Sequence, residues 1–116
     1  MNAPVFISYS SKDQEAAETI CSELESRQLK CWIAARDVEP GDNYQAAIVK
    51  AIRFAKVMVL IFTKNADDSD EIKNELALAS QHQLVVIPVR VDDVAPNDAL
   101  AYALATRQWI DLFRES

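Results

Sequence analysis

The run Val57-Met58-Val59-Leu60-Ile61-Phe62 decides the fold class of this chain. An unbroken apolar run of this length is typical of a central strand in a parallel sheet, where helices cover both faces and no side chain meets water. It is far too short to cross a bilayer as a helix. A central strand of this kind requires further strands and covering helices from the sequence on either side of it.

Working outward, strand-like and helix-like segments alternate along the whole chain. Strands are predicted at residues 5–8, 29–33, 57–62, 84–89 and 108–111. Amphipathic helices are predicted at residues 11–28, 44–52 and 71–81, and residues 97–106 form a short helix or an irregular segment. Ser11 and Gln14 fit a capping box that would begin the first helix. Such alternation predicts an α/β fold, a flavodoxin-like parallel sheet in the order 2-1-3-4-5 with helices on both faces.

Chain length limits the number of domains, and glycine content limits the kinds of binding or catalytic motif that the chain can contain. The chain has 116 residues, which is the size of one domain. Its single glycine, Gly41, excludes a Walker loop, a G-x-G-x-x-G fingerprint and a G-x-S-x-G nucleophile elbow. The chain stops soon after the fifth strand, and residues 112–116 look like the start of another helix. We therefore expect residues 1–116 to be a single domain cut from a longer protein with a sensor or oligomerisation domain.

Charge and cysteine usage bear on partners and compartment. A net charge of −6 argues against nucleic acid or an anionic membrane as the main partner. Cys21 and Cys31 form neither a C-x-x-C pair nor a disulfide framework, so they are predicted to be reduced, buried thiols of a cytoplasmic protein. His82, the only histidine, has no cysteine or second histidine near it, so no metal site is expected.

A ligand site is expected where parallel strands 1 and 3 end, because that is the switch point of this strand order. Residues 8–13, 34–42 and 63–69 would line it. Ser8-Tyr9-Ser10-Ser11 is a run of hydroxyls that leads into a helix N-terminus, which could hold a phosphate without glycines. The alternative is that these side chains only cap the helix.

Glu75 interrupts the apolar face of the third long helix. At about 100° per residue, it shares one arc with Ile72, Leu76, Leu78 and Ala79. A carboxylate there must reach a cleft or else be buried at a cost of several kcal/mol. Glu71 lies one turn earlier, and two such carboxylates raise one another's pKa. The alternative is a structural glutamate paired with one of three basic residues: Arg53, Lys73 or Arg90.

Several motifs, taken together, carry a family resemblance. They are Val5-Phe6-Ile7-Ser8-Tyr9-Ser10, Cys31-Trp32-Ile33, Arg36-Asp37-Val38-Glu39-Pro40-Gly41, Phe62-Thr63, Ser69 with Asn74-Glu75-Leu76, Val86-Ile87-Pro88-Val89 and Trp109-Ile110-Asp111. In this order and spacing, the chain resembles a TIR (Toll/interleukin-1 receptor) domain of the bacterial kind over essentially its whole length.

The resemblance implies one of two functions. Many TIR domains cleave NAD between ribose and nicotinamide, and others are pure interaction modules. Glu75 matches the glutamate that is essential in the enzymes. An aromatic residue commonly stands four residues before that glutamate, and here Glu71 departs from the pattern. Trp32 could supply an aromatic surface near the pocket instead, or it could simply pack in the core.

The resemblance also implies the remaining site residues. Lys12, Arg36 and Lys64 are the candidate partners of the NAD pyrophosphate, together with the N-terminus of the first helix. The other substrate-binding candidates are Ser8, Tyr9, Ser10, Ser11, Trp32, Asp37, Ser69 and Glu71. The BB loop of the family, which acts as a lid and an assembly surface, corresponds here to Val38, Glu39, Pro40, Gly41 and Asp42. NAD is then a substrate, no cofactor is implied, and the partners are other TIR domains.

The chemistry suits a carboxylate. Loss of neutral nicotinamide from a cationic pyridinium leaves an oxocarbenium-like ribose, which Glu75 would stabilise. The leading hypothesis is therefore an NAD glycohydrolase that releases ADP-ribose or a cyclic ADP-ribose, is activated by oligomerisation and serves bacterial anti-phage immunity. The rival is a non-catalytic TIR scaffold. A phosphoacceptor receiver is disfavoured because strand 3 ends in Thr63, and a serine hydrolase is disfavoured because His82 is remote from Ser10 and Ser11.

Overall fold

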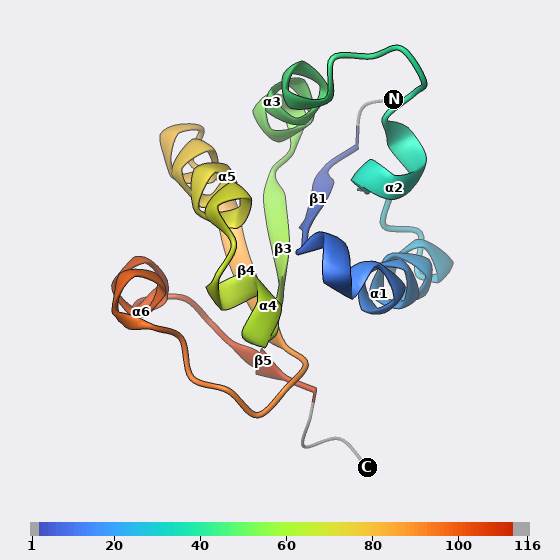
Figure 1. The fold of residues 1–116 in the computed structure, drawn as a ribbon. Helices are drawn as coiled ribbons and strands as arrows, with labels where there is room; N and C mark the ends of the chain where they lie inside the picture. Colours follow the sequence, from blue (N-terminus) through green and yellow to red (C-terminus); the bar gives the residue numbers. More distant parts are fainter. Residues whose placement is uncertain (1–2, 113–116) are drawn as a thin grey trace.

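Five parallel strands form one sheet in the order β2-β1-β3-β4-β5, which confirms the predicted topology (Figure 1). The computed structural model describes residues 3–112. The strands are β1 (Val5–Ser8), β2 (Cys31–Trp32), β3 (Val57–Phe62), β4 (Val85–Arg90) and β5 (Ile110–Asp111). The helices are η1 (Ser11–Asp13), α1 (Gln14–Ser26), α2 (Ala34–Asp37), α3 (Tyr44–Phe54), α4 (Lys64–Asp67), α5 (Asp70–Gln81) and α6 (Asp98–Leu104).

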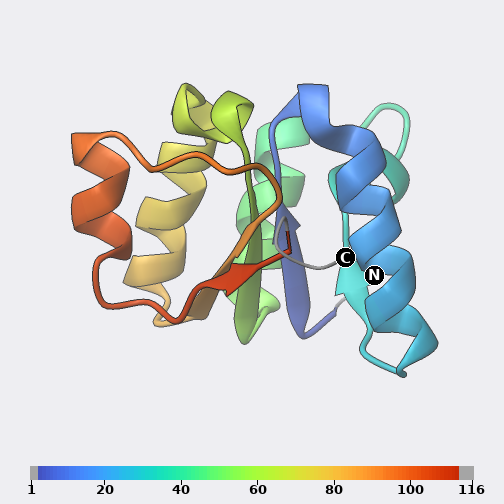
Figure 2. The same ribbon diagram turned by 90° about the horizontal axis from the view of Figure 1, so that it is seen from below.

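Alternation along the strands divides the core into two layers. Met58, Leu60 and Phe62 of β3 pack against the helices α3, α5 and α6. Val59 and Ile61 pack on the opposite face, against α1. Figure 1 shows α1 on one side of the sheet and α3 and α5 on the other, and Figure 2 shows α6 beside α5. Because the side-chain period of a strand is two, one apolar run supplies both layers.

The edge strands are shorter than predicted. The predicted strand at residues 29–33 contracts to Cys31–Trp32, because the chain is still turning after α1: Gln28 has φ 68° and Leu29 remains 45% exposed. The predicted strand at 108–111 contracts to Ile110–Asp111, which pairs only with Val89 and Arg90.

The predicted capping box at Ser11 is wrong. Ser11 begins the 3₁₀ turn η1, whose N-cap is Ser10: the Ser10 hydroxyl accepts a hydrogen bond from the Lys12 N–H. The helix α1 then begins at Gln14 without a side-chain cap. The Asp13 carboxylate, which accepts hydrogen bonds from Thr63 and Asn65, ties this turn to the end of β3.

Two of the segments predicted to line the ligand site, residues 34–42 and 63–69, contain short helices. Residues 34–37 form α2, and residues 64–67 form α4, whose N-cap Thr63 accepts hydrogen bonds from the Asn65 and Ala66 N–H groups. Pro40 and Gly41 form a turn in the loop that follows α2. Gly41 has φ 90°, a region that side-chain-bearing residues adopt only with strain.

Two expectations concern the ends and the membrane. The further helix predicted at 112–116 falls almost entirely outside the described residues, and the one described residue, Leu112, is not helical. Across residues 3–112, no helix is both long and apolar enough to cross a membrane.

Candidate active site

Glu75 lies on the buried face of α5, as the helical arc predicted. The residues of α5 that are buried are Ile72, Glu75, Leu76 and Ala79. The helix begins at a fixed point, because the Ser69 hydroxyl accepts a hydrogen bond from the Ile72 N–H. Glu75 itself is 6% exposed, so its carboxylate is held among apolar neighbours.

Among residues 3–112, one side-chain hydroxyl donates a hydrogen bond to this carboxylate. Ser8, the last residue of β1, is fully buried and donates a hydrogen bond of 2.7 Å to Glu75 Oε1. Ser8 has the same strand parity as Phe6, which packs in the layer of α3 and α5. The period of β1 therefore aims the hydroxyl at α5, and this bond joins two segments separated by 67 residues in the sequence.

The surroundings of Glu75 favour its protonated form. Burial raises the pKa of Glu75 to about 7; the hydrogen bond from Ser8 lowers it, and the charge of Glu71 raises it further. The proposed structural partners are engaged elsewhere, Lys73 with Asp70 and Arg90 with Asp111. Within residues 3–112 no ion pair to Glu75 is formed.

Glu75 opens into a cavity of about 520 Å³ between α3 and α5. Its walls combine apolar side chains, two amides and two carboxylates: Tyr44, Gln45, Ile48, Val49, Glu71, Asn74, Glu75 and Leu78. A smaller cavity of about 200 Å³ adjoins it and shares Tyr44 and Glu71. A concave, mostly apolar site with a few convergent polar groups is the usual form of a small-molecule site.

The hydroxyl run at residues 8–11 is divided among several tasks. Ser8 bonds Glu75, and Ser10 caps η1. The Tyr9 hydroxyl accepts a hydrogen bond from the Ala35 N–H, and Tyr9 and Ser11 line the smaller cavity. Ser69 acts as the cap of α5. The structure thus brings Ser8 into contact with Glu75 and places Tyr9 and Ser11 in the adjoining smaller cavity.

The aromatic ring beside Glu75 belongs to Tyr44, not to Trp32. Trp32 is 4% exposed and stacks on Phe6 with ring centroids 5.2 Å apart, so it packs in the core. It lines a separate cavity of about 280 Å³, with Asp37 and Asp42. Tyr44 is the first residue of the amphipathic helix predicted at residues 44–52, and it is 46% exposed. Tyr44 directly follows the N-cap Asn43, in the first turn of α3. This position at a helix end was the sequence signal that could have identified Tyr44 as a site residue.

The predicted basic residues lie away from Glu75. Lys12 lines a cavity on the α1 side of the sheet with Asp13 and Thr63. Lys64 is exposed on α4. Arg36 is engaged in ion pairs at the other edge of the sheet. Among the described residues, no lysine or arginine lines either cavity at Glu75.

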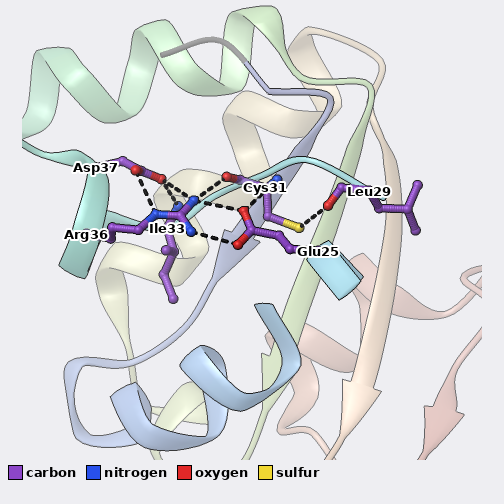
Figure 3. A network of polar contacts seen from close by, with 6 residues as sticks. All are labelled: Glu25, Leu29, Cys31, Ile33, Arg36 and Asp37. Atoms are coloured by element: carbon purple, nitrogen blue, oxygen red, sulfur yellow. Dashed lines mark hydrogen bonds and ion pairs between the residues drawn. The ribbon is translucent and has the colours of Figure 1, made fainter. Parts of the chain in front are cut away.

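Arg36 joins Glu25 and Asp37 in a compact network, which we call the Arg36 clamp (Figure 3). Its Nη1 and Nη2 donate to the two oxygens of Glu25 at 2.8 and 3.0 Å, and Nε donates to Asp37 at 2.9 Å. Nη2 also donates to the Cys31 carbonyl, and Asp37 accepts from the Ile33 N–H. The hydrogen bonds from Arg36 lower the pKa of Glu25. Arg36 and Asp37, predicted to bind substrate, therefore hold α2 to the end of β2.

Cys21 and Cys31 lie beside this clamp. Both are free and buried, as predicted. Their sulfurs and a Glu25 oxygen lie within 4.8 Å of one another, a grouping that could in principle hold a metal ion. Burial raises the pKa of both thiols, that of Cys31 to about 12, and Arg36 occupies both Glu25 oxygens. Deprotonating these thiols to bind a metal ion is therefore costly. We interpret the three residues as part of the packing between α1 and β2.

The geometry defines a flavodoxin-like α/β domain with an acidic pocket at the end of its central strands. The sequence pattern that defines the TIR domain matches residues 5–116, so this chain belongs to the TIR domain family. The fold agrees with the crystal structure of the TIR domain of the Toll-related receptor TRR-2 from Hydra magnipapillata. That comparison gives a TM-score of 0.78 and 23% identity, and it covers 97% of this chain and 86% of the other.

Two curated relatives are similar in sequence. The stimulator of interferon genes protein of Magallana gigas is 33% identical over 78% of this chain, which corresponds to 25% of that protein. The probable 2' cyclic ADP-D-ribose synthase BdTIR of Brachypodium distachyon is 30% identical over 83% of this chain and 43% of that protein. The chain thus spans from a quarter to less than half of the length of these relatives.

Proposed function

We propose that this domain cleaves NAD between nicotinamide and ribose, with Glu75 as the catalytic carboxylate. The observation that carries the proposal is a buried carboxylate with a raised pKa and no cationic partner among the described residues, which opens into a cavity of about 520 Å³. Strongly shifted pKa values cluster at functional sites. The relative from Brachypodium distachyon, named a probable 2' cyclic ADP-D-ribose synthase, supports the same chemistry.

The reaction breaks the C–N bond between ribose and nicotinamide, and its electron pair stays on the ring nitrogen. Positive charge then develops on the ribosyl carbon, and an ionised Glu75 in an apolar cavity stabilises it strongly. Ser8 fixes Oε1 of the carboxylate and so pre-sets its orientation. Water or a hydroxyl of the substrate then attacks the ribosyl carbon and loses its proton, which gives ADP-ribose or a cyclic ADP-ribose.

The phosphates of NAD call for a second copy of the domain. No lysine or arginine of residues 3–112 lines the cavities at Glu75. The loop at residues 39–42 is exposed and does not line either cavity, which suits it to contacts with a neighbouring domain. We therefore propose that oligomerisation completes the site. In a bacterial cell, the resulting loss of NAD would serve as a suicide response to phage.

The test is nicotinamide release from NAD by clustered protein, measured by chromatography and mass spectrometry. Glu75→Gln keeps the shape of the side chain and removes its charge, so we expect release to fall on the order of a hundredfold or more. Glu23→Gln makes the same change on an exposed, surface-paired carboxylate and serves as the matched control. Clustered wild-type protein that leaves NAD intact would contradict the proposal.

One alternative is a non-catalytic scaffold that signals by TIR–TIR assembly. The exposed loop at residues 39–42, outside the Glu75 cavity, favours it. The scaffold predicts assembly without turnover, visible by light scattering. A β-branched residue at Gly41, where φ is 90°, would then disrupt assembly, and Glu75→Gln would change nothing.

A further inference from the structure

Tyr44 and Glu71 stand between the two cavities near Glu75. Both residues line the cavity of about 520 Å³ that contains Glu75, and both line the adjoining cavity of about 200 Å³. They come from different helices, Tyr44 from the first turn of α3 and Glu71 from the first turn of α5. The two residues therefore form a wall that both cavities share.

The charges in these cavities are all negative. Glu71 and Glu75 carry them, and no lysine or arginine in the described part of the chain lines either cavity. Tyr44 lies close enough to these charges for them to shift its pKa. Burial raises its pKa above the usual range, and the charges of Glu71 and Glu75 raise it further. A cationic ligand is attracted to such a place, and an anionic one is repelled.

Tyr44 also offers an exposed aromatic ring to a ligand. Tyr44 is 46% exposed, whereas Trp32 is covered by the core. A cation near an aromatic face is stabilised by the electrons of the ring, and a nearby carboxylate adds to that attraction. An aromatic ring beside negative charges, in cavities that no described lysine or arginine lines, suits a flat cationic heterocycle.

We propose that Tyr44 and Glu71 form the recognition surface for a cationic pyridinium ring, so that the Glu75 cavity selects the N-ribosylated nicotinamide end of its substrate by charge. This inference rests on the proposed function and names the part of the substrate that the single domain recognises. It also gives the site a way to release product. When the C–N bond breaks, the electron pair remains on the ring nitrogen, the ring becomes neutral, and its attraction to Tyr44 and Glu71 weakens.

The test compares two probes that cannot be cleaved in this reaction: 1-methylnicotinamide, which is cationic, and nicotinamide, which is neutral. Binding to the wild-type domain is measured by calorimetry or NMR titration. We expect 1-methylnicotinamide to bind roughly threefold to tenfold more tightly than nicotinamide. Glu71→Gln should remove most of that preference. Tyr44→Leu should weaken binding of the cation, and Tyr44→Phe, which keeps the ring, should restore it.

Glu23→Gln is the matched control, since it removes one exposed carboxylate far from the cavity and should leave the preference unchanged. Equal binding of the two probes, no detectable binding of either, or unchanged preference in both Glu71→Gln and Tyr44→Leu would overturn the inference. Turnover separates this failure from that of the proposed function. Nicotinamide release without charge preference leaves the NAD reaction standing, and charge preference without release by clustered protein leaves only the binding site.

Discussion

Glu25 and Glu75 occupy opposite electrostatic surroundings in one small domain. Glu25, on α1, has both oxygens bound by Arg36 in the Arg36 clamp, and its pKa is lowered. Glu75, on α5, is more deeply buried, accepts a hydrogen bond from the Ser8 hydroxyl, and its pKa is raised to about 7. The carboxylate with a full set of partners holds secondary structure in place. The one with too few is free to respond to a ligand's charge.

The two glutamates should act on stability in opposite directions as pH changes. The folded-state pKa of Glu75 lies above its unfolded value of 4.5, so its contribution is present below about pH 4.5 and is lost as pH rises to about 7. The pKa of Glu25 is lowered, so its contribution is present above pH 4.5 and is lost as pH falls through its folded-state value.

The largest effect is expected at Glu75. Glu75→Gln removes a charge that is costly to bury, so it should increase the free energy of unfolding at pH 8 by up to ~3 kcal/mol. The gain should disappear near pH 4.5, where the wild-type carboxyl is protonated. Urea denaturation at the two pH values measures both quantities, and Glu23→Gln is the control. A Glu75→Gln protein less stable than wild type at pH 8 would show that the charge is compensated.

A smaller effect is expected at the Arg36 clamp. Arg36→Ala removes the partner of Glu25 and of Asp37, whose side chain is only 5% exposed, and should cost about 1–2 kcal/mol at pH 7. The cost should shrink as the pH falls below 4.5 and through the lowered pKa of Glu25, because that carboxylate then loses its charge.

Arg27→Ala is the matched control for the clamp. It removes an ion pair with Glu23 whose side chains are 69% and 63% exposed, and it should cost less than about 0.5 kcal/mol. Equal costs for the two arginines in denaturation experiments would mean that the clamp is an ordinary surface pair.

The smallest effect concerns Ser8. Ser8→Ala removes the hydrogen bond that lowers the pKa of Glu75, so that pKa should rise further. The reaction needs ionised Glu75, so the pH midpoint of nicotinamide release should move upward by about one unit or less. Rates near pH 7 should fall severalfold and recover at higher pH. Ser26→Ala, on the exposed end of α1, should leave the profile in place, and an unshifted Ser8→Ala profile would mean that another group sets it.

Local patterns were sufficient for much of this architecture. The apolar run of β3 predicted a central strand, and the alternation of elements predicted the strand order. The arc of α5 predicted the buried position of Glu75. The spacing of motifs along the chain identified the TIR family. Each of these follows from periodicity or from neighbours in the sequence, which need no knowledge of tertiary contacts.

The partners of the functional side chains depend on tertiary contacts, which local sequence patterns do not predict. No pattern in the sequence around Ser8 predicts that its hydrogen-bond partner is Glu75, which lies 67 residues further along the chain. Arg36 was expected to bind the NAD pyrophosphate, and its guanidinium pairs with Glu25. For Trp32 two roles were open, an aromatic surface near the pocket or core packing, and it stacks on Phe6 in the core. The sequence by itself determined which faces are apolar, and therefore the fold and the placement of one carboxylate inside it. Only the tertiary structure decided which charges meet, because the direction and partners of a long polar side chain depend on segments that become neighbours only when the sheet forms.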